Sequence, residues 1–294
     1  MEMTTVYIPE KGHRLNRKML GEAFELVDDP QAADVSIGWK TPTAGRRFDQ
    51  SIVCAAEPPI VGNIISTYRN AARWHTFVTY DPSTPNAIPF SVDAPHMYPF
   101  WPWLEMREHR PDEELRRHGK GIYFAGHRSP RPDLDAFGAE IIYQRRAEWA
   151  AALARALGGV CLGNGWPQTS KNDPRGWGAA KFAEMREGDF DFIFAAENCR
   201  LSGYISEKFW HGLLSDRVMV YMGHRRIKEV CDPAAYVFAD DFATPEELAA
   251  YLAAMTPRQY REIVHAARRV LDAVPKPQAA IDDLTQRIIE RISR

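Results

Sequence analysis

The chain has 294 residues, and its 37 lysines and arginines nearly balance 39 aspartates and glutamates, for a net charge of −2. This balance excludes a partner held by a strong basic field, nucleic acid above all. The four cysteines are far apart and form no CxxC pair, which indicates reduced thiols in a cytoplasmic protein. The sequence has no run of about 18 apolar residues and no signal-peptide core, so we expect a soluble protein.

The length indicates two domains, because about 100 to 200 residues per domain is usual. In the first half, short apolar runs predict strands at residues 4–9, 33–39, 51–59, 75–81 and 86–91. The segment KMLGEAFELV, residues 18–27, predicts a crossover helix between the first two strands. A charged segment follows at 107–120, and we place the two domains at 1–115 and 116–294.

Two features of the first half indicate a site. Glu57 is followed directly by Pro58 and Pro59, which cannot continue a central strand, so Glu57 lies at the carboxyl end of its strand. Such an end is a common position for functional side chains. Residues 94–106 are rich in aromatic residues and proline. Their rings suit stacking on sugars, and they suit equally a packed connector between the domains.

The second half alternates strands and helices. Strands are predicted at residues 121–127, 191–196 and 218–223, and helices at 141–159, 204–214 and 279–294. The first of these helices is expected to end at the glycine pair Gly158 and Gly159. A further helix is expected to begin at Thr244, with Pro245 at its first position and Glu247 completing a capping box.

The segment 190–223 is a strand, loop, helix and strand, about the length of a parallel crossover. Ligands bind beyond the carboxyl ends of strands in such units. The polar residues at that place are Glu197, Asn198, Tyr204, Glu207 and Lys208. Ser206 is a suitable helix cap, and a lysine in the first helical turn indicates a bound anion, for which phosphate is the natural candidate.

The triplet AEN at 196–198, YISEK at 204–208 and the apolar strand ending at Gly223 resemble the signature of a known family. It is the α-1,3/α-1,4-fucosyltransferases, glycosyltransferase family 10, here of the soluble bacterial type. The resemblance covers roughly residues 50–270 and implies the α/β GT-B fold, two Rossmann-like domains facing a cleft. Ala196 replaces the family's usual phenylalanine, and Cys199 stands where serine or threonine is common.

The resemblance also implies a reaction, the transfer of L-fucose from GDP-β-L-fucose to a glycan or lipopolysaccharide hydroxyl with inversion. Glu57 matches the family's acceptor-side glutamate and is the candidate catalytic base. Arg146 fits the family's arginine by its spacing to Trp149 and Leu153, with Arg145 as the reserve. Arg146 and Lys208 are expected to hold the phosphates.

The remaining residues of the signature receive donor-binding roles by the same resemblance. Glu207 is expected to bind the ribose hydroxyls, and Tyr204 to pack near the base or the fucose. Glu197 and Asn198 either reach the sugar or shape the loop.

The resemblance implies no cofactor besides GDP-fucose as donor substrate, and no divalent metal. Its partners are a nucleotide-sugar donor and a glycan acceptor. The departures at Ala196 and Cys199 leave open another GDP- or UDP-sugar as donor, or a homologue that binds without turnover. The helix at 279–294 either stays with the second domain or packs back on the first, and its basic end faces solvent or the inner membrane. Acceptor, linkage and oligomeric state stay open.

Overall fold

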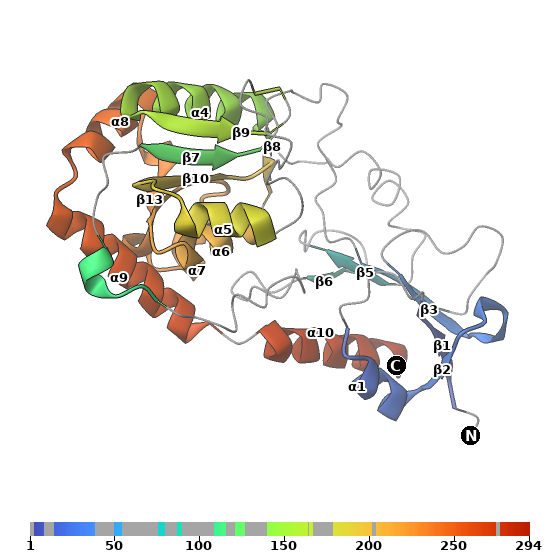
Figure 1. The fold of residues 1–294 in the computed structure, drawn as a ribbon. Coiled ribbons are helices and arrows are strands. Elements are labelled where there is room, and N and C mark those ends of the chain that lie inside the picture. The colour runs from blue at the N-terminus through green and yellow to red at the C-terminus, as the bar shows by residue number, and fades with distance from the viewer. Residues whose placement is uncertain are drawn as a thin grey trace.

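The computed structural model describes residues 3–8, 15–38, 50–54, 76–79, 87–89, 109–115, 121–126, 140–163, 165–166, 179–201, 204–274 and 277–294. These residues form two α/β units, each built on a parallel sheet (Figure 1). The predicted α/β class is confirmed. Glu57 and the aromatic segment 94–106, both singled out from the sequence, lie outside the described residues.

The first unit contains a six-stranded parallel sheet in the order β2-β1-β3-β4-β5-β6. Its strands are β1 (Thr5–Tyr7), β2 (Glu25–Val27), β3 (Val35–Gly38), β4 (Gln50–Cys54), β5 (Thr76–Thr79) and β6 (Ala87–Pro89). All of them except β2 lie on the predicted apolar runs. Val6, Val35, Ile37 and Ile52 are buried in its core, as suits the β-branched residues of a parallel sheet.

The segment 18–27, predicted as a single helix, divides into α1 (Arg17–Ala23) and the edge strand β2. The side chain of Asn16 caps α1 by accepting two first-turn amides at 3.1 and 3.2 Å. Phe24 then has extended backbone, with φ −142° and ψ 161°, and Leu26 pairs with β1. The single-helix prediction was wrong because strand pairing is a long-range contact that local periodicity does not reveal.

The second unit contains a five-stranded parallel sheet in the order β13-β12-β10-β7-β9. Its strands are β7 (Ile122–Ala125), β9 (Gly159–Leu162), β10 (Phe192–Ala196), β12 (Val218–Met222) and β13 (Val237–Phe238). Numbered within each sheet, both units follow the order 2-1-3-4-5, and the first adds a sixth strand. In such doubly wound sheets, ligands bind where the winding reverses. In the second unit this switch point lies between β7 and β10.

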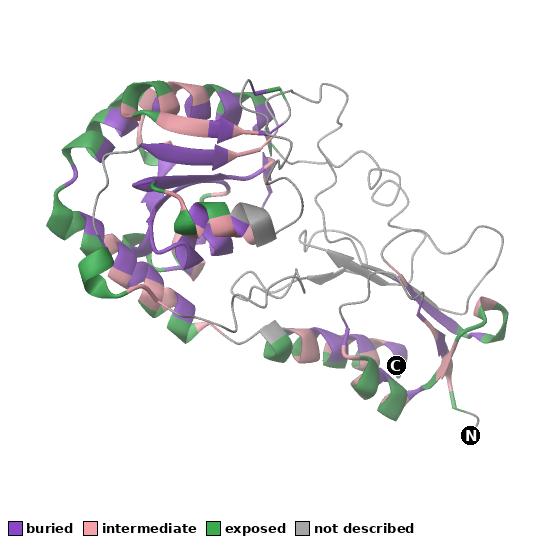
Figure 2. Cartoon of the chain, viewed as in Figure 1, coloured by how far each residue is buried: buried purple, intermediate pink, exposed green. Residues whose placement is uncertain are grey.

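Helices cover both faces of the second sheet, whose central strands are buried (Figure 2). They are α4 (Tyr143–Leu157), α5 (Ala179–Glu187), α6 (Glu207–Leu214), α7 (Ile227–Val230), α8 (Pro245–Ala254) and α9 (Pro257–Ala273). Short 3₁₀ turns occur at η1 (Pro30–Ala32), η3 (Asp112–Glu114), η4 (Pro233–Ala235) and η5 (Ala239–Asp241). On β12, Val220 packs with α4 and α8, whereas the next residue, Tyr221, packs with α6 and α9.

The predicted helix ends are found with one difference. Gly158 has φ +68° and ends α4, as expected. Thr244 caps α8, because its Oγ1 accepts the amide of Glu247 at 3.2 Å. The carboxylate of Glu247 returns to the amide of Ala243 at 2.9 Å, one residue before the position that a capping box requires. No helix of the described chain is long and apolar enough to cross a membrane.

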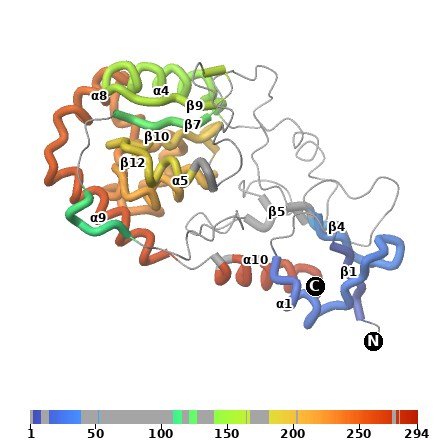
Figure 3. Tube along the Cα trace, in the orientation of Figure 1, coloured from blue at the N-terminus to red at the C-terminus, as the bar shows by residue number. Residues whose placement is uncertain are grey.

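The last helix, α10 (Pro277–Ile292), leaves the second unit and lies beside α1 (Figures 1 and 3). The amide of Asn16 donates to Thr285 Oγ1 at 2.9 Å, and Asn16 Nδ2 donates to Asp282 Oδ1 at 2.8 Å. Leu284 and Ile288 belong to the core of the first sheet. The C-terminal helix therefore completes the hydrophobic core of the N-terminal unit.

Residues 109–115 contact the second unit. Arg268 on α9 donates to the carbonyl of Arg110 at 2.7 Å and forms ion pairs of 2.9 Å with Asp112 and Asp216. Asp216 also accepts the amide of Arg110 at 2.7 Å. The segment that precedes β7 is thus fixed to α9. The boundary at residue 115 stays a prediction.

Candidate functional site

The candidate site begins where β10 ends, beside the switch point of the second sheet. Glu197 follows β10, and its amide donates to the carbonyl of Met222 at 2.8 Å. Asn198 leads into β11 (Cys199–Arg200), which pairs antiparallel with β8 (Glu140–Ile141) just before α4. This pairing brings the start of α4 to the loop after β10. Such a two-residue ladder gives no periodicity, and the sequence did not reveal it.

The carboxylate of Glu197 is completely buried, with an exposed fraction of 0%. Its Oε1 accepts the amide of Ser206 at 2.8 Å and the hydroxyl of Tyr221 at 3.2 Å. Its Oε2 accepts the hydroxyl of Ser206 at 2.6 Å and lies 3.6 Å from Lys208 Nζ. A buried carboxylate needs such partners, because isolated burial of a charge is costly. Glu197 therefore ties the loop after β10 to β12 and to the start of α6.

Lys208 lies in the first turn of α6, as predicted. Ser206 caps the helix, since its Oγ accepts the amide of Lys208 at 3.3 Å. Lys208 Nζ donates to Ser206 Oγ at 2.9 Å and lies 3.2 Å from Glu207 Oε1. Its side chain is 16% exposed and borders a small cavity with Tyr123 of β7 and Ala196 of β10. The ammonium group is therefore held at the helix N-terminus and at the switch point.

Arg146, in the first turn of α4, is 2% exposed. Its Nη1 donates to the carbonyls of Ala196 and Glu197 at 3.3 and 3.2 Å and to Asn198 Oδ1 at 2.6 Å. Its guanidinium carbon lies 4.4 Å from the centre of the Tyr143 ring. Burial lowers the pKa of Arg146, and the neighbouring tyrosines and glutamates oppose that shift. Its buried Nε has no hydrogen-bond partner among the described residues. Arg146 thus fixes the loop and keeps one donor unused.

The predicted site residues are only partly brought together. Arg146, Glu197, Asn198 and Lys208 form one continuous set of polar contacts, with Glu207 at its exposed end. The ring of Tyr204 is buried in the hydrophobic cluster of the first unit. That cluster also contains Tyr143, Cys199 and Leu201, so the two units meet beside the site loop. Glu57 lies outside the described residues.

Sequence reasoning missed Tyr221, which donates to Glu197 from the far side. Burial, and secondly the charge of Glu197, raise the pKa of Tyr221 well above its ordinary value. The hydroxyl therefore stays protonated and acts as a donor at neutral pH. A tyrosine among Val220 and Met222 on a buried strand is a usable signal, because buried tyrosine hydroxyls require a partner.

Metal-ligating side chains do not cluster in the part of the chain that the structure describes. No group of three or more His, Cys, Asp or Glu residues there has the arrangement of a metal site. Cys161, Cys199 and Cys231 are buried free thiols. Burial raises the pKa of Cys231 to about 12, so this thiol stays protonated at neutral pH.

Comparison with known proteins identifies the second unit. Residues 144–265 match Glycosyltransferase family 10 (fucosyltransferase) C-term. An alpha-(1,4)-fucosyltransferase of Arabidopsis thaliana is 32% identical over 110 residues, which are 36% of this chain and 27% of that protein. A glycoprotein 3-alpha-L-fucosyltransferase A of Drosophila melanogaster is 40% identical over 77 residues, 25% of this chain and 15% of that protein. The matches therefore cover only a minor part of these relatives.

A solved alpha1,3-fucosyltransferase with GDP shares the fold, with a TM-score of 0.57 at 11% identity over 99% of this chain and 89% of that chain. Its likeness concerns the fold alone, and the two α/β units have the predicted GT-B architecture. The family match spans the arginine at the start of α4 and the whole signature from Ala196 to Gly223. Residues 144–265 of the second unit are therefore similar to the C-terminal domain of glycosyltransferase family 10, and the rest of the chain lies outside that match.

Proposed function

We propose that this chain transfers L-fucose from GDP-β-L-fucose to a hydroxyl of a glycan or lipopolysaccharide acceptor, with inversion at the anomeric carbon. The observation that carries the proposal is the buried Glu197, which fixes Ser206 and Lys208 at the N-terminus of α6 within the matched domain. The names of the relatives describe fucosyl transfer, and the solved neighbour was obtained with GDP. These names support the donor.

The diphosphate of the donor is assigned to the space between the starts of α4 and α6. A helix N-terminus presents free amides and positive dipole character, and Lys208 adds a full positive charge there. Lys208 is held beside two carboxylates, Glu197 at 3.6 Å and Glu207 at 3.2 Å, which orient its ammonium group. The guanidinium of Arg146, buried behind the loop after β10, adds a second positive charge near this place. Charged hydrogen bonds of this kind strengthen when water is excluded.

The other donor contacts follow the same arrangement. Glu207 is partly exposed at the edge of the network and is assigned to the ribose hydroxyls. Asn198, held by Arg146, and the buried Tyr204 border the sugar end of the donor. We assign Glu197 a positioning role, because each of its oxygens is occupied by protein donors.

The proposed chemistry is a single in-line displacement. The acceptor hydroxyl oxygen forms a bond to the anomeric carbon while the bond from that carbon to the phosphate oxygen breaks, and GDP leaves with the electron pair. Glu57 accepts the hydroxyl proton, a role that rests on the resemblance of its sequence context. The cationic groups at α4 and α6 stabilise the charge on the leaving diphosphate. The proposal includes no metal and no covalent enzyme intermediate.

We further propose that residues 1–115 bind the acceptor and residues 116–294 bind the donor. The contacts of α10 with α1 make the last helix a part of the acceptor side. Its apolar residues Leu284 and Ile288 are buried against the first sheet and are not free for a bilayer. This favours a cytoplasmic enzyme over one held at the inner membrane by this helix.

The two departures from the family signature do not alter the polar groups of the site. The side chain of Ala196 packs in the cluster of α4 and α8, and Cys199 packs in the cluster of the first unit. We therefore retain fucose as the transferred sugar. Two alternatives remain, a different GDP- or UDP-sugar as donor and a protein that binds the donor without turnover. The experiments below separate both from fucosyl transfer.

Donor binding is tested by thermal unfolding with GDP, UDP and GDP-fucose. A ligand at 100 times its dissociation constant adds about 2.7 kcal/mol to the free energy of unfolding. GDP and GDP-fucose should raise the melting temperature, and stabilisation by UDP alone would contradict the donor assignment. Lys208→Ala should weaken GDP binding about tenfold or more through loss of a charged hydrogen bond. Lys18→Ala, an exposed lysine on α1, is the matched control.

Catalysis is tested by the release of GDP from GDP-fucose with a glycan panel, for the wild type and Glu57→Gln. The variant should bind GDP normally and lose at least about a hundredfold in kcat, as expected for removal of a general base. Normal turnover by the variant removes Glu57 from this role. If the wild type binds GDP but transfers fucose to no acceptor of the panel, the alternative of a homologue that binds without turnover is favoured.

A further inference from the structure

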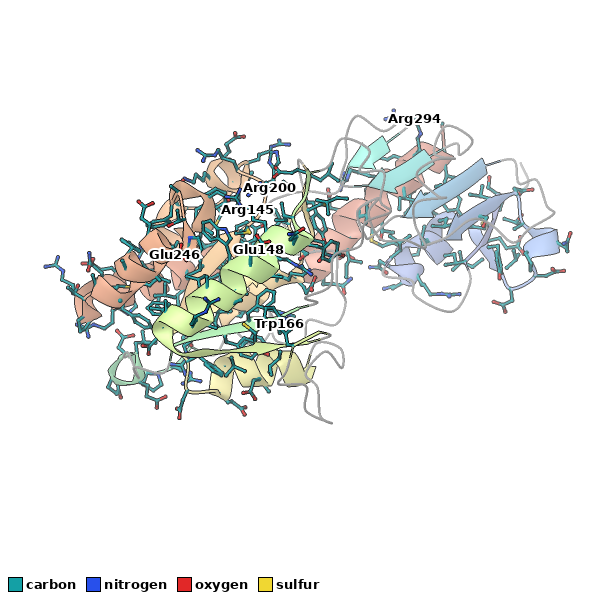
Figure 4. All side chains as sticks on the ribbon, turned by 90° about the horizontal axis from the view of Figure 1, so that it is seen from above. Arg145, Glu148, Trp166, Arg200, Glu246 and Arg294 are labelled. Carbon is teal, nitrogen blue, oxygen red and sulfur yellow. The ribbon has the colours of Figure 1, made fainter. Side chains whose placement is uncertain are left out.

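A second pocket opens at the carboxyl edge of the second sheet, next to the donor site. Its volume is about 290 Å³, and it is lined by Arg145, Arg200, Gly223, Arg225, Phe238 and Asp240. These residues come from the start of α4, from β11, from the turn after β12 and from the end of β13. Figure 4 labels Arg145 and Arg200, whose side chains lie near each other beside α4. Three guanidinium groups and a single carboxylate form the polar lining.

The three arginines are held by ion pairs and differ in exposure, from 15% for the side chain of Arg200 to 69% for that of Arg225. Asp240 accepts Arg145 Nη2 at 3.1 Å and Arg200 Nη2 at 2.6 Å, and Arg200 Nη1 also binds Glu140. Arg225 is 69% exposed, and its guanidinium carbon lies 5.8 Å from the centre of the Phe238 ring. Arg225 Nη2 also lies 3.8 Å from Asp241 Oδ1. Each guanidinium has five N–H donors, so these ion pairs leave several of its donors unused. The lining therefore combines fixed cations with donors that a ligand is able to use.

The pocket adjoins each part of the proposed donor site. Arg145 precedes Arg146, and Arg200 lies two residues after Asn198. Gly223 follows Met222, whose carbonyl accepts the amide of Glu197 at 2.8 Å. Gly223 also lines the pocket, and a Cβ at this position would overlap the hydroxyl oxygen of Tyr221, so a larger residue does not fit beside Tyr221.

We propose that this pocket binds an acidic sugar of the acceptor, one that carries a carboxylate, sulfate or phosphate group. The inference rests on the proposed fucosyl transfer and specifies its acceptor. Because the pocket belongs to the donor-binding unit, it would hold one acidic unit of an acceptor that residues 1–115 otherwise bind. Guanidinium groups match planar and tetrahedral oxyanions through paired N–H donors. The volume of about 290 Å³ is just below the range of about 300 to 1,000 Å³ for small-molecule sites, which suits a single sugar unit. The donor diphosphate uses the separate cations at α4 and α6.

Direct binding tests the pocket without turnover. Glucose, glucuronate and glucose 6-sulfate are titrated into the full chain at low salt, with and without GDP. Glucuronate and the sulfate should bind at least about fivefold more tightly than glucose, since an exposed arginine gives a modest charged hydrogen bond. Added salt should reduce this preference. Equal binding of glucose and glucuronate overturns the proposal, whether or not GDP binds.

The residues are tested by Arg225→Ala, with Arg226→Ala as the matched control. Arg226 is the next residue, pairs with Glu229 at 3.7 Å and does not line the pocket. Arg225→Ala should remove most of the preference for glucuronate and leave the stabilisation by GDP unchanged. In transfer assays it should raise the KM for an acceptor ending in a uronate about five- to tenfold, with little change in kcat and none for the neutral analogue.

The outcomes separate this pocket from the donor assignment. An unchanged preference in Arg225→Ala, or an equal loss in Arg226→Ala, overturns the acidic-sugar site. Loss of all GDP binding in the wild type overturns the proposed function instead. In that case the glucuronate titration still tests whether the pocket binds an acidic sugar, because it does not depend on GDP.

Discussion

Glu197 and Asp240 are two carboxylates at the same edge of the second sheet, and both hold cationic side chains, but they differ in burial. Glu197 is 0% exposed, and its oxygens are occupied by Ser206, Tyr221 and Lys208. Asp240 has a side chain that is 13% exposed and faces an open pocket. The difference indicates that an enclosed carboxylate fixes a loop, whereas a carboxylate beside an open pocket leaves its arginine partners accessible to a ligand.

The largest effect is expected from Glu197→Gln, which keeps the shape and removes the charge. The new amide places N–H donors against donors of Ser206 or Tyr221 and leaves Lys208 without its buried counter-charge. Loss of one partner of a buried ion pair costs about 3 to 5 kcal/mol. Urea denaturation measures the free energy of unfolding, and GDP binding should weaken with it. A loss below about 1 kcal/mol would show that the charge of Glu197 does not hold the loop.

A neighbouring pair of arginines extends the comparison. Arg146→Met removes three donor contacts to the loop after β10 and should cost about 2 to 4 kcal/mol, because two buried carbonyls lose their partner. Arg145→Met removes a half-exposed ion pair with Asp240 and should cost less than about 1 kcal/mol. The loss of unfolding free energy in each variant is measured from the midpoint of its urea denaturation curve. Equal losses would mean that burial does not distinguish the two sites.

Tyr221→Phe is expected to have an intermediate effect, about 1 to 2 kcal/mol, through loss of the hydrogen bond to Glu197. The wild type should also be the more alkali-sensitive protein. Because burial raises the pKa of Tyr221, its contribution is complete below the pKa of an unfolded tyrosine, about 10. It is lost as pH rises from there towards the folded pKa. The stability difference between wild type and variant, measured from pH 8 to 11, should shrink with pH. A constant difference would contradict this linkage.

Asp240→Asn should have a small effect on folding, about 1 kcal/mol, because the amide oxygen of asparagine can still accept from Arg200 and the other partner, Arg145, is 43% exposed. The substitution should have a larger effect on ligand binding in the pocket. Removing the single lining carboxylate leaves Arg145, Arg200 and Arg225 with more positive potential, so glucuronate should bind more tightly. Titration with glucuronate and glucose gives the result. Weaker binding would indicate that Asp240 orients the arginines and does not merely compete for them.

Much of this molecule was predictable because the relevant patterns are local. Apolar runs predicted β10 and β12, helical spacing predicted α4 and α6, and Ser206 was identified as a cap. The residues of the family signature also indicated the GT-B fold. The strand β2 was missed because its pairing with β1 is decided by a distant segment.

By itself, the sequence determined most of the helices and strands, the order of the two units and the residues that surround α6, because each depends on spacing along the chain. The tertiary structure alone decided that Arg146 turns inward while Arg145 lines an open pocket, and that Glu197 is enclosed by Ser206 and Tyr221. It also brought Arg225 beside Phe238 at the mouth of that pocket. Burial and long-range contacts set these roles, and neither is encoded in the spacing of a single segment.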